Sequence, residues 1–244
     1  MSKPKILTVI SNYNEEKLIE CCINDFKENS TIESDLLVID NGSTDRSMEL
    51  ILKSNVACLR HPVNTGGSVG VIKTALLYSF LNDYDIYCHL DGDCQHNANE
   101  LNKLIQPIVD GSADIVIGSR FLDKEGFQSF FMRRLGIFSF SYLVSFISGQ
   151  KITDLTSGFR AYNKKAISFF AQQYKHEFEP CIQMLLIAHY ARLVIKEVPV
   201  VMNPRIAGRS AIDLIQSLKF PVFGIIFIIG TVLQKDNIRR IACR

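Results

Sequence analysis

The sequence predicts an α/β protein with a single, mostly parallel central sheet and flanking helices. Short apolar, β-branched runs alternate with helical segments along the first half of the chain, and this alternation favours right-handed crossovers between parallel strands. Polar residues come directly after several of these runs, at the sheet edge where open α/β sheets bind ligands. The 244 residues suffice for one large domain with a sizeable core.

The predicted elements follow one another closely. Strands are expected over 5–11, 36–40, 56–60, 85–90, 115–120 and 193–200, and a further strand follows the polar turn that begins at Asp154. Helices are expected over 15–28, 46–54, 71–81, 98–109, 164–172 and 179–190, with Asn14 as the N-cap of the first. The aromatic segment 126–149 is either a buried helix or a helix that lies near lipid.

Composition excludes several classes of protein. Hydrophobic residues make up 47% and charged residues 21% of the chain, so it is neither disordered nor fibrous. The net charge of +2 gives no reason to expect nucleic-acid binding. Seven cysteines without CxxC spacing indicate reduced thiols rather than disulfides or zinc, and Cys94 alone lies in an acidic loop where reactivity is conceivable. No secretory signal precedes the first strand, so we expect a cytoplasmic protein.

Two carboxylates stand at the end of the strand predicted over 85–90. Asp91 and Asp93 flank Gly92, and Gln95 follows two residues later. Residues two apart in an extended chain share a face, so the two carboxylates would repel each other unless a hard cation such as Mg²⁺ or Mn²⁺ lies between them. Gln95 could add a neutral oxygen ligand. The alternative is an ordinary surface turn, because Asp and Gly are common turn residues.

The Gly-rich loop from Asn64 to Gly70 is weaker evidence. Its glycines do not have GxGxxG spacing, and the Gly-Lys-Ser/Thr of a P-loop is absent. A dinucleotide-binding fold and an NTPase are therefore disfavoured.

The C-terminal segment is apolar and basic. Its apolar core, 220–233, has 14 residues, whereas a bilayer span needs about 20. A helix over 211–244 that contacts a membrane surface or another copy of the chain is the better interpretation.

Seven short motifs, taken in order, resemble family 2 glycosyltransferases with the GT-A fold, and most closely the dolichyl-phosphate mannose synthase-like branch of polyprenyl-phosphate glycosyltransferases. The match covers residues 6–210, so the expected organisation is a GT-A domain over 1–210 with a Rossmann-like sheet, followed by the segment 211–244. The motifs are Tyr13-Asn14-Glu15, Val38-Ile39-Asp40-Asn41-Gly42-Ser43-Thr44-Asp45, Asn64-Thr65-Gly66, Asp91-Gly92-Asp93-Cys94-Gln95-His96, Gly118-Ser119-Arg120, Thr156-Ser157-Gly158-Phe159-Arg160 and Gly208-Arg209-Ser210.

The resemblance implies roles for individual residues. Asp91, Asp93 and Gln95 match the metal-binding DxD motif and its glutamine, with Mg²⁺ or Mn²⁺ as the cofactor. Arg120 and Arg133 resemble arginines near the acceptor phosphate, and Asp154 lies on the acceptor side. The remaining matches are to the nucleotide-sugar site: Tyr13, Asn14, Glu15, Asp40, Asn64, Gly66 and Arg209. Two positions depart from the family, with Asn41 where a second acid is usual and Gly92 where Ala is common.

The implied reaction is metal-dependent, inverting transfer of a sugar from a UDP- or GDP-sugar to a polyprenyl phosphate, at the cytoplasmic face of a membrane. A phosphate nucleophile is already anionic near neutral pH and needs no base. The alternative acceptor is a lipid-linked saccharide or cell-surface polysaccharide, whose hydroxyl requires a base, and Asp154 is the candidate for it. An alternative of another class is a non-catalytic nucleotide-sugar-binding protein.

Overall fold

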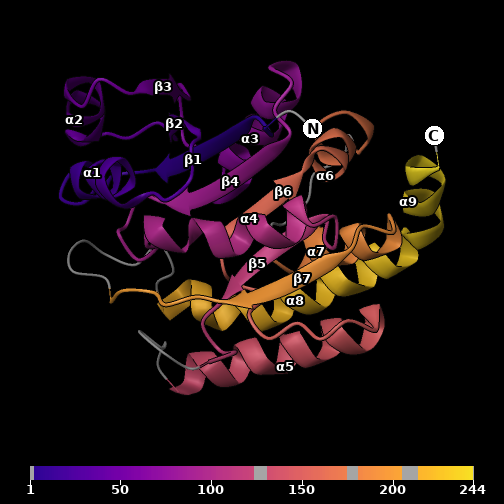
Figure 1. Ribbon diagram of the computed structural model, residues 1–244. Helices are drawn as coiled ribbons and strands as arrows, with labels where there is room; N and C mark the ends of the chain where they lie inside the picture. The colour runs from indigo at the N-terminus through magenta and orange to yellow at the C-terminus, as the bar shows by residue number, and fades with distance from the viewer. Residues whose placement is uncertain (1–2, 124–130, 175–180, 205–213, 244) are drawn as a thin grey trace.

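The computed structural model describes residues 3–123, 131–174, 181–204 and 214–243; within these ranges the side chains of 131–135 and 214–222 are outside the description. The described residues form one mixed sheet in the order β3-β2-β1-β4-β6-β5-β7 (Figure 1). All neighbouring strands are parallel except β6, which runs antiparallel to β4 and β5, so the predicted mostly parallel sheet is confirmed. The strands are β1 (Ile6–Asn12), β2 (Asp35–Asp40), β3 (Ala57–Arg60), β4 (Ile86–Asp91), β5 (Ile115–Ser119), β6 (Arg160–Asn163) and β7 (Ile195–Pro199).

Helices cover both faces of the sheet. They are α1 (Ile19–Asn29), α2 (Ser47–Lys53), α3 (Ser68–Leu81), η1 (Ala98–Glu100) with α4 (Leu101–Val109), α5 (Phe131–Ser148), α6 (Lys164–Ser168) with the π-helical η2 (Phe169–Gln173), α7 (Ile182–Tyr190), α8 (Leu214–Leu233) and α9 (Lys235–Ala242). The division of the C-terminal segment into α8 and α9 was not predicted, since one helix was expected over 211–244.

The inner strands β1, β4 and β5 are buried on both faces, as their largely apolar sequences lead one to expect. In β2, Val38 packs with α1, α2 and α4 in one core cluster. Leu37 and Ile39 point to the other face and pack in the cluster that includes residues of α3, α5, α7 and α8. The two clusters hold the sheet between two layers of helices.

The first helix begins later than predicted. It starts at Ile19, and its N-cap position is Leu18, so the prediction of Asn14 as the N-cap was wrong. Asn14 instead has a left-handed backbone, with φ of 54°. Its side-chain Oδ1 accepts a hydrogen bond from the Thr44 N–H at 2.8 Å, which ties the loop after β1 to the loop after β2.

The C-terminal helices pack on the domain through α5 and α7. A Cβ atom at Gly224 of α8 would lie 2.7 Å from the Phe140 ring of α5, so the two helices meet closely there. Ile228 of α8 and Ile238 of α9 are buried in the same core cluster as α7. None of the described helices combines the length and hydropathy needed to cross a bilayer. The predicted boundary at 210/211 falls at residues outside the description and stays a prediction.

Candidate active site

The parallel strands bring the predicted polar residues to one edge of the sheet. Ser11 at the end of β1 pairs with Asp91 at the end of β4, and Asn12 pairs with Asp40 at the end of β2. Arg120 follows β5 directly. The antiparallel β6 begins at Arg160, so the turn that precedes it reaches the same edge.

Asp91 is held by neighbours from three segments. One carboxylate oxygen accepts a hydrogen bond from Ser11 Oγ at 3.1 Å and lies 3.4 Å from His89 Nε2, while the other lies 3.8 Å from His96 Nε2. The Asp91 N–H donates to His96 Nδ1 at 3.0 Å, which assigns the ring proton of His96 to Nε2.

These contacts decide the charge of Asp91. Burial alone would raise its pKa, but the contacts with His89, His96 and the Ser11 hydroxyl outweigh burial and place the pKa below the ordinary value. Burial lowers the pKa of His96. Asp91 is therefore a carboxylate at neutral pH, ready to act as an anionic ligand.

Two glycines allow the backbone to approach this carboxylate. A Cβ at Gly158, in the turn before β6, would lie 2.6 Å from Asp91 Oδ2. A Cβ at Gly92 would lie 2.7 Å from the Ser11 carbonyl oxygen, and the Gly92 N–H donates to that oxygen at 2.8 Å. This close approach gives a physical reason for Gly92 where the family commonly has Ala.

Asp93 and Gln95 lie on the loop that follows β4. The Gln95 N–H donates to Asp93 Oδ1 at 3.1 Å, and the Gln95 amide nitrogen donates to the Asn203 carbonyl at 3.2 Å. Among the described residues, no group of three or more His, Cys, Asp or Glu side chains is arranged to hold a metal ion. Two carboxylates nevertheless fit Mg²⁺ or Mn²⁺, which usually take their other ligands from water and substrate phosphates.

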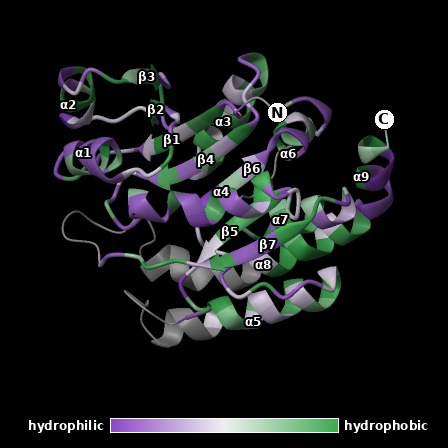
Figure 2. Ribbon diagram, viewed as in Figure 1, coloured by the Kyte–Doolittle hydropathy of each residue, from purple (hydrophilic) through white to green (hydrophobic). Residues whose placement is uncertain are grey.

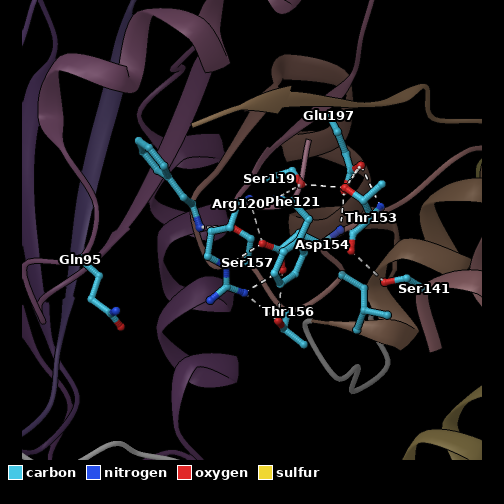
Figure 3. A network of polar contacts seen from close by, with 12 residues as sticks. Gln95, Ser119, Arg120, Phe121, Ser141, Thr153, Asp154, Thr156, Ser157 and Glu197 are labelled. Atoms are coloured by element: carbon cyan, nitrogen blue, oxygen red, sulfur yellow. Dashed lines mark hydrogen bonds and ion pairs between the residues drawn. The ribbon is translucent and has the colours of Figure 1, made fainter. Parts of the chain in front are cut away.

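Arg120 is fixed by a buried ion pair (Figure 3). Its Nε and Nη2 donate to the two oxygens of Asp154 at 2.7 and 2.8 Å, and Nη2 also donates to Thr156 Oγ1 at 2.9 Å. The Asp154 side chain is 0% exposed and that of Arg120 is 11% exposed. Because both oxygens of Asp154 bind the guanidinium, this carboxylate orients Arg120; the predicted role of Asp154 as a base stays a prediction.

Glu197 of β7 holds the backbone of the segment that carries Asp154. It accepts hydrogen bonds at 2.8 Å from the backbone N–H groups of Thr153 and Asp154 and from Thr153 Oγ1. Burial raises the pKa of Glu197, although these hydrogen bonds oppose the shift. Gln95 lies apart from this network in Figure 3.

Asp40 is buried, and it accepts hydrogen bonds from the end of β1 and from the loop that follows β2. It accepts hydrogen bonds from Asn12 Nδ2 at 2.8 Å and from the Ser43 N–H at 3.1 Å, and Arg60 Nε lies 3.5 Å away. The other amide atom of Asn12, Oδ1, is buried without a hydrogen-bond partner in the described structure. The contact of Asp40 with a nucleotide base stays a prediction.

Asn41 organises the Gly-rich loop. Its Nδ2 donates to the Gly67 carbonyl at 2.9 Å, and its Oδ1 accepts from Thr65 Oγ1 at 2.7 Å. Asn64 Oδ1 accepts the N–H groups of Gly66 and Gly67, both at 3.0 Å. An amide can both donate and accept, which a second acid at position 41 could not do when ionised.

The other predicted residues have mixed outcomes. Tyr13 is 43% exposed at the same edge, and the Glu15 N–H donates to Ser47 Oγ. The side chain of Arg133 and the whole of Arg209 lie outside the described residues.

Four residues at this edge were given no role from the sequence: Asn12, His89, Glu197, and His96, which belongs to the motif at 91–96. His89 carried a usable signal, because it lies two positions before Asp91 and therefore on the same face of β4. Nothing in the sequence joins Glu197 to Asp154.

Comparisons with known proteins identify the family of the chain. The family model "Glycosyl transferase family 2" matches residues 8–170, about two thirds of the chain. UDP-N-acetylglucosamine–dolichyl-phosphate N-acetylglucosaminyltransferase of Methanococcus voltae is 27% identical over 82% of this chain and 86% of that protein. Dolichol-phosphate mannosyltransferase of Pyrococcus furiosus is 28% identical over 84% of this chain and 58% of that protein. These names support the branch indicated by the motifs.

Solved structures of the same fold are also found. Glucosyl-3-phosphoglycerate synthase of Mycobacterium tuberculosis, in complex with Mn²⁺, UDP-glucose and phosphoglyceric acid, superposes with a TM-score of 0.65 at 19% identity, covering 93% of this chain and 79% of that one. At this identity the likeness concerns the fold, which is the predicted GT-A fold. On the family match, the chain belongs to glycosyl transferase family 2 and is a glycosyltransferase.

Proposed function

We propose that this enzyme transfers a sugar from a UDP- or GDP-sugar to a polyprenyl phosphate, with inversion at the anomeric carbon. The observation that carries the proposal is the pairing, at one sheet edge, of the Asp91 and Asp93 loop with an arginine held in place by Asp154. The two relatives named above act on dolichyl or dolichol phosphate by name, which supports a lipid phosphate as acceptor.

Asp91 and Asp93 are the groups that would hold the cofactor. A Mg²⁺ or Mn²⁺ ion bound there supplies charge neutralisation for the leaving nucleoside diphosphate. His89, His96 and Ser11 keep Asp91 ionised and aimed, so the ligand carries full negative charge before the donor binds. We place the nucleoside on the side of Asp40 and the Asn64–Gly67 loop, which Asn41 holds.

Arg120 would bind the acceptor phosphate. A charged guanidinium forms strong hydrogen bonds to phosphate oxygens, and its fixation in advance by Asp154 and Thr156 lowers the entropic cost of that contact. Asp154 and Glu197 are positioning groups in this proposal. The acceptor phosphate is its own nucleophile, so the occupied oxygens of Asp154 present no obstacle.

We further propose that α5 and α8 meet the membrane surface in which such an acceptor lies. Exposed apolar side chains gather on these two helices, and Figure 2 shows hydrophobic stretches along both ribbons. The most exposed are Tyr142 (76%), Phe146 (77%) and Leu233 (80%). The basic helix α9, with Arg239 and Arg240, adds attraction to anionic lipid.

A flotation assay tests the membrane contact. The wild-type chain should float with vesicles that contain anionic lipid, and the double variant Tyr142→Ser/Phe146→Ser should float several-fold less. Leu81→Ser, which removes an equally exposed side chain from α3 (71%), is the matched control. A wild-type chain that forms a dimer, which the double variant alone abolishes, would instead assign this face to a second copy of the chain.

An acceptor panel tests the reaction. Labelled UDP- and GDP-sugars are offered with either polyprenyl phosphate or a lipid-linked saccharide, and products are separated by extraction into organic solvent. The proposal expects label on the polyprenyl phosphate that is released by mild acid. Label found only on the saccharide would contradict it and return Asp154 to consideration as a base.

A further inference from the structure

Three thiols from two segments meet beside the loop that carries Asp93. Cys21 and Cys22 belong to α1, and Cys94 follows Asp93 directly. The Sγ atoms of Cys22 and Cys94 lie 3.0 Å apart, and the Cys94 N–H donates to Cys22 Sγ at 3.1 Å. Cys21 also interacts with the Cys94 thiol. Cys21 is exposed, Cys22 is buried and Cys94 is half-buried.

The geometry is close to that of a disulfide. A disulfide has an S–S length of about 2.05 Å, so the two sulfur atoms need to approach by roughly 1 Å. Both cysteines lie on well-packed backbone: Cys22 is part of the core beneath α1, and Cys94 Sγ donates to the Leu18 carbonyl at 3.4 Å. The pair is therefore held together before any bond forms, which favours intramolecular reaction over reaction with solvent species.

We propose that Cys22 and Cys94 form a reversible disulfide through Cys21, and that this bond ties the Asp93 loop to α1. The oxidant is a low-molecular-weight disulfide. The contact with Cys94 raises the pKa of Cys21 to about 11, so the exposed Cys21 thiol must lose its proton before it attacks. Its sulfur then breaks the S–S bond of the small disulfide, which gives a mixed disulfide and releases one thiol. Cys94 then displaces the second thiol to give Cys21–Cys94, and Cys22 attacks Cys94 to leave Cys22–Cys94 and a free Cys21. Two protein thiols are oxidised, one small disulfide is reduced to two thiols, and the protons pass to those thiols.

The Cys22–Cys94 disulfide would displace the loop that carries Asp93. Asp93 is adjacent to Cys94, while Gly92 on the other side is fixed to Ser11 by the backbone hydrogen bond. Drawing Cys94 toward α1 therefore moves the Asp93 carboxylate relative to Asp91. Misplacement of a catalytic group by about 1 Å costs up to ~10²-fold in rate. We expect sugar transfer by the oxidised form to fall by about tenfold or more, since α1 takes up part of the movement. This second half rests on the proposed function; the formation of the bond does not.

The test uses the full chain and oxidised glutathione as the probe. After incubation, free thiols are alkylated and the peptides are identified by mass spectrometry. The expected result is a linked Cys22–Cys94 peptide that dithiothreitol releases. Cys22→Ala and Cys94→Ala should abolish this peptide, Cys21→Ser should slow its appearance, and Cys58→Ser on β3 is the matched control that leaves it unchanged. Thermal melting of each variant identifies any that fails to fold.

The outcomes distinguish the formation of the disulfide from its effect on sugar transfer. Cys22 and Cys94 that stay alkylatable while Cys21 carries glutathione would overturn the proposal, as would linkage to another cysteine. A linked peptide in a protein whose sugar transfer is unchanged would overturn the regulatory half alone. A linked peptide in a chain that transfers sugar from no donor, oxidised or reduced, would count against the proposed function and leave the disulfide standing.

Discussion

Replacement of Gly158 by Ala probes Asp91 without altering any carboxylate. The added Cβ would lie 2.6 Å from Asp91 Oδ2, and ordinary contact begins at 3.4 Å, so the carboxylate must move by about 0.8 Å. The alternative, a shift of the turn before β6, is opposed by Arg160, which donates to the Ser157 and Leu155 carbonyls at 2.8 Å. A displacement near 1 Å at a reacting group costs ~10²-fold in kcat/KM.

The assay is the metal dependence of sugar transfer. We expect kcat/KM to fall ~10²-fold at saturating metal, together with a higher metal concentration for half-maximal activity, while the melting temperature changes little. Gly136→Ala is the matched control, because a Cβ at this helical glycine in α5 meets nothing within 4 Å in the described structure. Wild-type kcat/KM and metal response in Gly158→Ala would refute the placement of Asp91 in the reacting machinery.

Three further predictions concern the buried ion pair, the carboxylate of Asp114 and the metal. Asp154→Ala removes the carboxylate that neutralises the buried Arg120 guanidinium, so urea unfolding should show a loss of about 3–5 kcal/mol, and KM for the acceptor should rise; unchanged stability would contradict the ion pair. Burial alone would raise the pKa of Asp114, but a backbone N–H, Asn163 and Lys165 hold it below the ordinary value. Its contribution to stability is then present above the unfolded pKa of about 3.9 and is lost as pH falls through the folded-state pKa, so Asp114→Asn should flatten the acid limb of a urea-unfolding series; parallel limbs would contradict this. Chelation with EDTA should abolish transfer, and excess Mg²⁺ or Mn²⁺ should restore it, whereas activity that survives extensive chelation would remove the metal from the mechanism.

The sheet was predictable because its strands are strongly patterned. Buried parallel strands such as 36–40 and 115–119 are short, apolar and followed by polar turns, and these signals are local in the sequence. The antiparallel direction of β6 was not predicted, since strand pairing depends on contacts between distant segments. The start of the first helix was predicted wrongly, because Asn14 is a residue type that often caps helices but here bonds to Thr44 of another loop.

The gathering of polar residues at one sheet edge was predictable from the strand pattern, but contacts within the site were predictable only between neighbours in the sequence. The Asp91–Asp93 pair and the turn at 156–160 are local motifs, and the structure brings them into contact through Gly158. The contacts that each side chain makes with residues far away in the sequence were not predictable. The ion pair between Arg120 and Asp154 spans 34 residues, and the support from Glu197 comes from β7, more than 40 residues further on.

The most direct test of the account measures label in the lipid fraction after incubation of the chain with labelled UDP- and GDP-sugars, polyprenyl phosphate and Mg²⁺ or Mn²⁺, beside Asp93→Asn. The account predicts metal-dependent labelling of the polyprenyl phosphate by the wild-type chain and loss of that labelling in the variant, whose fold is verified by its melting temperature. Full labelling by Asp93→Asn would contradict the metal site, and donor binding without labelling of any acceptor would contradict the proposed reaction.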